Sequence, residues 1–193
     1  MKPEELHDNL GRYIKISLEE TAYFLSLLEK KEIPNRKFLL AQGEPCTYFS
    51  LVDKGCLINY FTDDAGDDHV LQFATRMWWT ADLDSLFRGI PAEYNIRAMG
   101  DSTVYQLSKD VWMKLNNELP QFERYFRIIF QNALVAHQKR IIQNISDTAD
   151  QRYLKFQKAY PEVIRSVPLK YVASYLGITP EFLSKIRRDL TTR

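Results

Sequence analysis

A long helical stretch between two differently patterned regions most limits how this chain can fold. Over residues 121–145, apolar side chains recur at helical spacing, from Phe122 to Ile145. Such a helix is about 37 Å long at 1.5 Å per residue. The strand region before it is too small to cover that length, so we expect a second subunit to pack along it. Burial within its own subunit is the alternative. The predicted dimer seam comprises Phe126, Ile129, Phe130, Ala133, Leu134, His137 and Ile141.

The region before this helix has the pattern of short strands. Apolar and aromatic runs separated by turn residues occur at 38–40, 48–52, 56–62, 69–73, 94–99 and 103–107. Several short strands at this spacing predict a small antiparallel barrel or sandwich. A helix precedes them, because Ser17 and Glu20 form a capping box ahead of Leu18, Ala22, Leu25 and Leu28. We therefore expect an α+β protein, with a further short helix around Val111 to Leu115.

The last part of the chain returns to helices. A polar break at 146–150 is followed by a predicted helix at 148–159, and residues 169–188 read LKYVASYLGITPEFLSKIRR. Gly177 suits a helix end that needs a positive φ, and Thr179 can cap the next helix, which begins at Pro180. Ala173 is small enough for two helices to cross closely. This spacing predicts a helix-turn-helix.

The second helix of this pair turns a polar face outward at i, i+3, i+4 and i+7. In a helix-turn-helix such a face lies in the major groove of DNA, where Arg and Lys pair with guanine and Glu with cytosine. The candidate DNA-binding residues are Thr179, Glu181, Ser184, Lys185, Arg187 and Arg188. An ordinary helical hairpin with solvated charges is the alternative.

Charge is distributed unevenly along the chain. Residues 151–193 hold nine basic and three acidic side chains, net +6, whereas residues 1–150 hold 17 basic and 22 acidic, net −5. A basic C-terminal region on an acidic body indicates that the end of the chain contacts a polyanion.

Several functional classes find no support in the composition. The two cysteines, Cys46 and Cys56, lack C-x-x-C spacing, and the three histidines lie far apart, so we expect no metal site and no cofactor. No catalytic set is suggested by spacing, which argues against a small barrel enzyme of the cupin type. No apolar run approaches the ~20 residues that span a bilayer, and the N-terminus has no secretory core. We expect a cytoplasmic protein that is not an enzyme.

The order of these regions resembles the Crp/Fnr family of bacterial transcription regulators. The segment Gln42-Gly43-Glu44-Pro45 and its continuation to Gly55 resembles the barrel opening of that family, and ITPEFLSKIRR is similar to its Bacteroidetes branch. The resemblance implies a β-roll of the cyclic-nucleotide-binding type (a double-stranded β-helix), a homodimer formed through the long helix, and a palindromic DNA operator. The implied domains are 1–118 for the roll with its N-terminal helix, 119–146 for the dimerisation helix and 147–193 for the helix-turn-helix.

The resemblance also locates an effector pocket, where this chain departs from the family. Members that bind cyclic AMP carry Gly-Glu-Leu and Arg-Ser, but the ungapped equivalents here are Ala81-Asp82-Leu83 and Ala92-Glu93. A carboxylate repels a phosphate, so we expect an unknown small-molecule effector rather than cyclic AMP. Arg88 and Arg97 are the possible substitutes for the missing arginine. The candidate pocket residues are Trp78, Trp79, Asp82, Leu83, Glu93 and Asn95.

The sequence offers little support for a haem site or for a wing hairpin. A haem would need an axial ligand such as His69 or Cys46. A lone histidine on a strand is more often structural, so we expect no haem. Only Thr191-Thr192-Arg193 follow Leu190, so we expect no wing hairpin after the second helix of the pair. A sensing module that acts through protein contacts, without DNA, is the alternative function.

Overall fold

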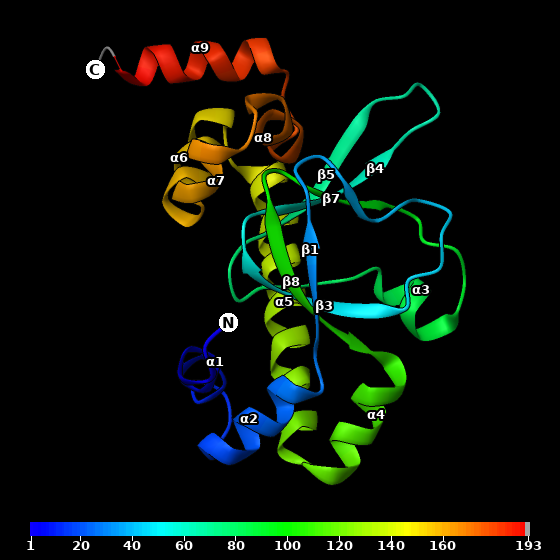
Figure 1. Cartoon of the computed structure of the whole chain (residues 1–193). Helices are drawn as coiled ribbons and strands as arrows, with labels where there is room; N and C mark the ends of the chain where they lie inside the picture. Colours follow the sequence, from blue (N-terminus) through cyan, green and yellow to red (C-terminus); the bar gives the residue numbers. More distant parts are fainter. Residues whose placement is uncertain (192–193) are drawn as a thin grey trace.

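The computed structural model describes residues 1–191 and places an antiparallel β-roll beside one long helix, with helices at both ends (Figure 1). The helices are α1 Pro3–Leu10, α2 Leu18–Ser26, α3 Leu83–Arg88, α4 Lys109–Glu118, α5 Gln121–Ser146, α6 Ala149–Ala159, α7 Pro161–Ser166, α8 Leu169–Leu176 and α9 Pro180–Thr191. The strands are β1 Glu29–Ile33, β2 Phe38–Leu40, β3 Tyr48–Lys54, β4 Leu57–Thr62, β5 Asp68–Ala74, β6 Trp79–Thr80, β7 Asn95–Ala98 and β8 Ser102–Ser108. Thr192 and Arg193, part of the predicted basic region, lie outside the described residues.

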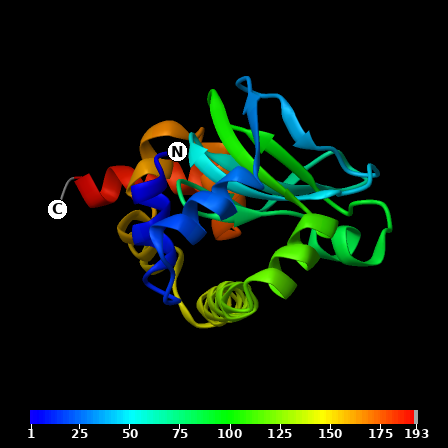
Figure 2. The same cartoon turned by 60° about the horizontal axis from the view of Figure 1, so that its bottom comes forward.

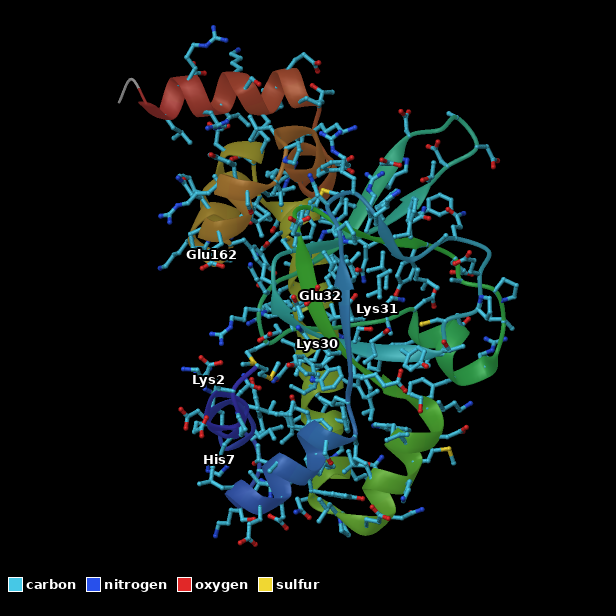
Figure 3. All side chains as sticks on the ribbon, in the orientation of Figure 1. Lys2, His7, Lys30, Lys31, Glu32 and Glu162 are labelled. Atoms are coloured by element: carbon cyan, nitrogen blue, oxygen red, sulfur yellow. The ribbon has the colours of Figure 1, made fainter. Side chains whose placement is uncertain are left out.

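The strands form two four-stranded antiparallel sheets, ordered β1-β8-β3-β6 and β2-β7-β4-β5. The predicted strands and the α+β class are confirmed. Five elements escaped the sequence analysis: α1, α3, α7, β1 and β6. Strand β1 reads EKKEI and pairs with β8 along one edge of its sheet, where the labelled side chains of Lys30, Lys31 and Glu32 are exposed (Figure 3). Charged side chains are common on edge strands, and they hide the apolar alternation that identifies a strand.

Helix α2 begins where its capping box predicts. The Ser17 hydroxyl accepts a hydrogen bond from the Glu20 amide at 3.1 Å, and the Ser17 amide donates to the Glu20 carboxylate at 2.8 Å. The buried face is a correction to the sequence analysis. Thr21 and Phe24 are buried, whereas Leu18 at the first position is 56% exposed and Ala22 is exposed. The prediction missed this because the first turn of α2 lies at the surface.

The first turns of α5 are anchored in an aromatic core at the end of the roll. Phe122, Tyr125 and Phe126 are almost completely buried, and the Trp79 indole N–H donates to the Tyr125 hydroxyl at 2.9 Å. The predicted place of Phe126 in the dimer seam is therefore wrong. Its ring is 1% exposed and packs against Trp79, with 5.6 Å between ring centroids.

A second core joins the roll to the C-terminal helices. Apolar side chains on β4 and β5, such as Ile58 and Phe73, pack in one cluster with side chains of α6–α9, such as Phe156, Val172 and Leu183. The two parts also share hydrogen bonds: the Ser174 hydroxyl on α8 donates to the Asp68 carbonyl at 2.8 Å and accepts from the Val70 amide at 2.9 Å. Helix α8 thereby covers the edge strand β5.

A tight turn between β3 and β4 provides a test of this arrangement. Gly55 has φ +89°, and a Cβ at this position would lie 2.9 Å from Ser102 Cα and 2.3 Å from Ser102 Oγ. We expect Gly55→Ala to destabilise the roll well beyond the ~1–2 kcal/mol of a left-handed residue, because the neighbouring turn must also shift. The midpoint of urea unfolding measures this.

Gly66→Ala is the matched control. Gly66 has a similar φ of +86° but nothing within 4 Å of the added Cβ, so this variant shows the conformational cost alone. Equal losses of stability in the two variants would contradict the predicted contact with Ser102.

Candidate functional site

Helices α8 and α9 and the turn between them lie where the sequence predicts a helix-turn-helix. Gly177 has φ +66°, and the Ile178 amide donates back to the Ala173 carbonyl at 3.1 Å, which closes α8 in a Schellman arrangement. The Thr179 hydroxyl accepts from the Phe182 amide at 3.2 Å and caps α9 as the sequence predicts. Ala173 is fully buried where the two helices meet.

Helix α9 has sharply separated faces. Leu183 and Ile186 are buried against the other C-terminal helices. The predicted DNA-binding positions are all exposed: Thr179, Glu181, Ser184, Lys185, Arg187 and Arg188. Glu181, Ser184, Lys185 and Arg188 lie opposite the buried face, whereas Arg187, four residues after Leu183, lies at its edge. Figure 1 shows α9 along the outer edge of the molecule, on the far side of α6–α8 from the roll. The sequence-predicted DNA-binding residues thus form one accessible surface, which we call the α9 face.

The second half of α5 carries an uncovered apolar stripe. Leu134 is 59% exposed, Ile141 60%, and Ile145 82%, and Val135 and Ile142 flank them. Figure 2, in which α5 is seen nearly end-on, shows the other elements to one side of the helix. The stripe spans 12 residues, about 18 Å of helix.

The predicted seam residues divide between two faces of α5. Leu134 and Ile141 lie on the exposed stripe, together with Ile145, which the predicted set omits. Ile129, Ala133 and His137 instead line a cavity that faces the roll and the C-terminal helices, and Phe130 packs partly buried against the roll.

The interior of the roll contains a cavity of about 220 Å³ with polar walls. Ser50 accepts from the Gln106 amide group at 3.3 Å, and the Thr80 hydroxyl donates to Asn59 at 2.9 Å. The described residues that line this cavity include one basic side chain, Lys31. Among the described residues, the walls therefore offer neutral hydrogen-bonding groups with one basic and one acidic side chain, Lys31 and Glu44, and no arginine.

The six predicted pocket residues are not gathered at one site. Trp78 and Trp79 line the cavity beside α5, whereas the other four line neither of the two larger cavities. Both carboxylate oxygens of Asp82 are used as caps: they accept from the Ser85 amide at 3.1 Å and the Glu93 amide at 2.9 Å.

The remaining three pocket residues also have other positions. Glu93 and Leu83 lie at the surface, and Asn95 accepts from the Gln42 amide at 2.9 Å.

Neither candidate arginine reaches the roll interior. Arg88 is at the surface, 3.4 Å from the Asp84 carboxylate. Arg97 points towards the C-terminal helices: it donates to the Tyr171 hydroxyl at 2.5 Å and lies 3.8 Å from the Asp68 carboxylate. Sequence reasoning missed this contact, because the partners of Arg97 come from β5 and α8, far away in the chain.

Both cysteine side chains are buried, and burial raises the pKa of each thiol. The Cys56 side chain lies in the core shared with the C-terminal helices, and burial raises the pKa of its thiol to about 12. Cys46 lies in the other core, where burial also raises the pKa of the thiol. Among residues 1–191, no three His, Cys, Asp or Glu side chains are placed to hold a metal ion.

The contact between α8 and β5 gives a second prediction. In Ser174→Ala, the Asp68 carbonyl and Val70 amide lose their partner, which costs about 1–3 kcal/mol, so the C-terminal helices should open more often. We expect Cys56 to react with iodoacetamide about tenfold faster or more, while Cys46 in the other core keeps its rate. Peptide mass spectrometry resolves the two thiols.

The matched control is Ser166→Ala, which removes a hydroxyl bonded only within α7, to the Glu162 carbonyl. Equal labelling of Cys56 in both variants, or acceleration of both cysteines together, would contradict local opening at α8.

This architecture is similar to that of a known domain family and of several solved structures. Residues 30–118 match the family of cyclic nucleotide-binding domains. FixK2 from Bradyrhizobium japonicum aligns with a TM-score of 0.73 at 17% identity, over 86% of this chain and 85% of FixK2. The c-di-GMP responsive global regulator CLP from Xanthomonas campestris aligns with a TM-score of 0.71 at 14% identity, over 91% and 92%.

The catabolite activator protein from Thermus thermophilus is also similar, with a TM-score of 0.58 at 16% identity over 95% of this chain and 87% of that protein. No curated protein matches the sequence. These alignments confirm the predicted β-roll of the cyclic-nucleotide-binding type followed by helices. Within residues 1–191, none of the helices has the length and apolar character needed to cross a membrane.

Proposed function

We propose that this protein is a homodimeric, sequence-specific DNA-binding transcription regulator of the Crp/Fnr type, with no catalytic activity. The observation that carries the proposal is the α9 face, where six polar side chains stand exposed on a helix anchored by a helix-turn-helix turn. A helix presented this way fits the major groove. The fold shared with FixK2, CLP and the catabolite activator protein supports the same reading.

The contacts assigned to the α9 face follow from side-chain chemistry. Lys185 and Arg188 donate to guanine acceptors, Glu181 accepts from cytosine, and Ser184 reads either edge. Arg187 and Thr179, near the edges of the face, contact phosphates and set the register. A palindromic operator follows if the two α9 helices of a dimer are related by a twofold axis.

The second subunit is proposed to cover the stripe on α5. The stripe is apolar, runs parallel to the helix axis and lies on the side of α5 that the roll leaves open. Pairing with an identical stripe buries apolar side chains on both helices and is self-complementary, as a twofold interface requires.

The roll is proposed to accept an effector other than cyclic AMP. A cyclic phosphate is bound by cations and free N–H donors, but Asp82 already accepts from the amides of Ser85 in α3 and Glu93 before β7, and Lys31 is the one basic side chain among the described residues that line the roll cavity. Arg97 is held by Tyr171 and Asp68, and Arg88 is at the surface.

The α9 face is tested with Lys185→Ala combined with Arg188→Ala. We expect roughly a hundredfold or greater loss of affinity for a duplex that the wild-type protein selects from a random pool, because each specific contact contributes ~1–3 kcal/mol. The dependence of affinity on salt should also become less steep. Fluorescence anisotropy over a salt series measures both.

Lys30→Ala combined with Lys114→Ala removes the same charge from β1 and α4, where neither side chain lines a cavity, and should leave binding unchanged. Equal losses of affinity in the two double variants would show that overall charge, and not the α9 face, determines binding. Failure of the wild-type protein to select any duplex would favour the protein-contact alternative.

The stripe is tested with Ile145→Glu. This side chain is 82% exposed in the single chain, so the subunit should fold normally, but in a twofold seam two carboxylates would be buried together. We expect sedimentation to shift from a species of twice 22.7 kDa towards 22.7 kDa.

Asn144→Glu adds the same charge one residue away, about 100° around the helix and off the stripe, and should remain dimeric. A wild-type protein that sediments at 22.7 kDa at every concentration would exclude the dimer.

A further inference from the structure

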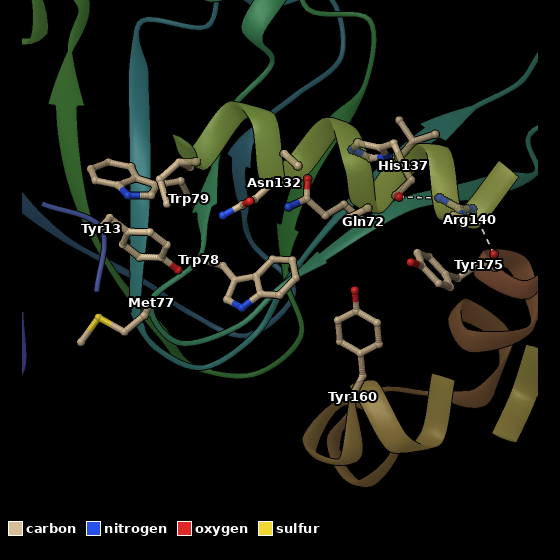
Figure 4. A pocket seen from close by; sticks show the side chains of 14 residues that line it. Tyr13, Gln72, Met77, Trp78, Trp79, Asn132, His137, Arg140, Tyr160 and Tyr175 are labelled. Carbon is tan, nitrogen blue, oxygen red and sulfur yellow. Dashed lines mark hydrogen bonds between the residues drawn. The ribbon is translucent and has the colours of Figure 1, made fainter. Parts of the chain in front are cut away.

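A separate cavity of about 250 Å³ lies where the roll, α5 and the C-terminal helices meet (Figure 4). The roll contributes Trp78, α5 contributes His137 and Arg140, and the C-terminal helices contribute Tyr160 and Tyr175. The volume corresponds to about eight water molecules in the liquid, enough for a small bicyclic molecule. It is distinct from the cavity inside the roll.

The walls are largely aromatic. The rings of Trp78 and Tyr160 meet with 5.9 Å between centroids at 59°, which forms a corner with flat faces. Trp78 lines the cavity and is 38% exposed, so part of its indole ring is accessible to a ligand. In Figure 4 the Trp78 ring comes from the roll and the Tyr160 ring from the C-terminal helices, and the Tyr160 hydroxyl points towards α5. Such surfaces favour a planar ligand.

Arg140 supplies the charge. Its guanidinium donates to the carbonyls of Leu71 at 2.6 Å, Val70 at 2.9 Å and Tyr175 at 3.0 Å, and lies 4.0 Å from the centre of the Tyr175 ring. The buried Nε–H has no hydrogen-bond partner. In the part of the chain that is described, Arg140 has no carboxylate partner, and no Asp or Glu lines the cavity.

His137 also lines the cavity, and burial together with the neighbouring Arg140 lowers the pKa of its imidazole, which favours the neutral ring. Burial lowers the pKa of the Arg140 guanidinium as well, but an arginine keeps its charge in a protein, so Arg140 remains the cation of the cavity. The guanidinium is held by neutral carbonyls and the Tyr175 ring, and leaving it without an opposite charge is costly, because buried charges are normally paired.

We propose that this cavity binds a small planar aromatic carboxylate, with its ring against Trp78 and Tyr160 and its charge paired with Arg140. The aromatic corner selects the flat apolar part, and the unpaired guanidinium selects the anion. If the proposed regulator function holds, the ligand joins the roll to Tyr160 and Tyr175 and so sets the position of α9.

The test uses two probes of almost equal shape, indole-3-acetate and its neutral amide, indole-3-acetamide. By isothermal titration calorimetry on the full chain at pH 7, we expect the carboxylate to bind at least tenfold more tightly than the amide. Arg140→Gln keeps N–H donors for the carbonyls but loses the charge, so the ratio of affinities should fall to about one. Lys139→Gln removes a neighbouring charge that does not line the cavity and should keep the ratio.

Ala136→Phe fills the cavity from α5 and should abolish binding of both probes. Unchanged Cys56 labelling in this variant shows that the C-terminal helices stay docked. No heat with millimolar indole-3-acetate, or an unchanged ratio in Arg140→Gln, would overturn the proposal. The assay contains no DNA, so its failure is distinct from failure of the regulator function. Cyclic AMP titrated in the same way tests the roll separately.

Discussion

The outer face of the sheet β2-β7-β4-β5 is apolar, and its burial determines where the C-terminal helices lie. Ile58, Tyr60, Val70 and Phe73 are at most 3% exposed although they point away from the roll interior. Burying side chains of this size contributes about 1.5–3 kcal/mol each. The sheet is therefore covered on both faces, and the helix pair cannot behave as an independent unit on a flexible linker while this core is intact.

Polar contacts give the apolar core a defined register. An apolar surface alone allows sliding, whereas the two bonds of Ser174 to β5 accept only one position of α8. Arg97 and Arg140 add contacts from β7 and α5 to the same helix. The orientation of α9 consequently depends on three parts of the chain, which is what a ligand-responsive regulator requires. A change at β5, β7 or α5 would alter the bonds that hold α8, and α9 follows α8 directly through the turn at Gly177.

The sequence predicts the elements well and their contacts poorly, for identifiable reasons. Capping residues and turn glycines act locally, so Ser17, Gly177 and Thr179 mark helix ends that the structure confirms. Strand β1 was missed because its side chains are charged, and α7 because it is only six residues long.

The predicted dimer seam on the long helix α5 shows the same difference between readable elements and unreadable contacts. Its apolar positions are readable, but the division into core, cavity and open stripe depends on how far the roll extends along it. For that reason Phe126 was assigned to the seam although it is a core residue. The partners of Arg97 and Arg140 lie on distant segments, and no local pattern reports them.

A ligand at the junction cavity can act only through unequal affinity for different arrangements of the chain. Its proposed walls come from the roll, α5 and the C-terminal helices, so the complete site exists only while these parts are docked. A bound anion would then favour the docked arrangement by RT ln(1 + [L]/Kd), about 2.7 kcal/mol at a hundredfold excess over Kd. That is comparable to the cost of breaking the hydrogen bonds of one buried side chain such as Ser174. The equilibrium between docked and open C-terminal helices is thus within reach of a weakly bound metabolite, without any change in the roll interior.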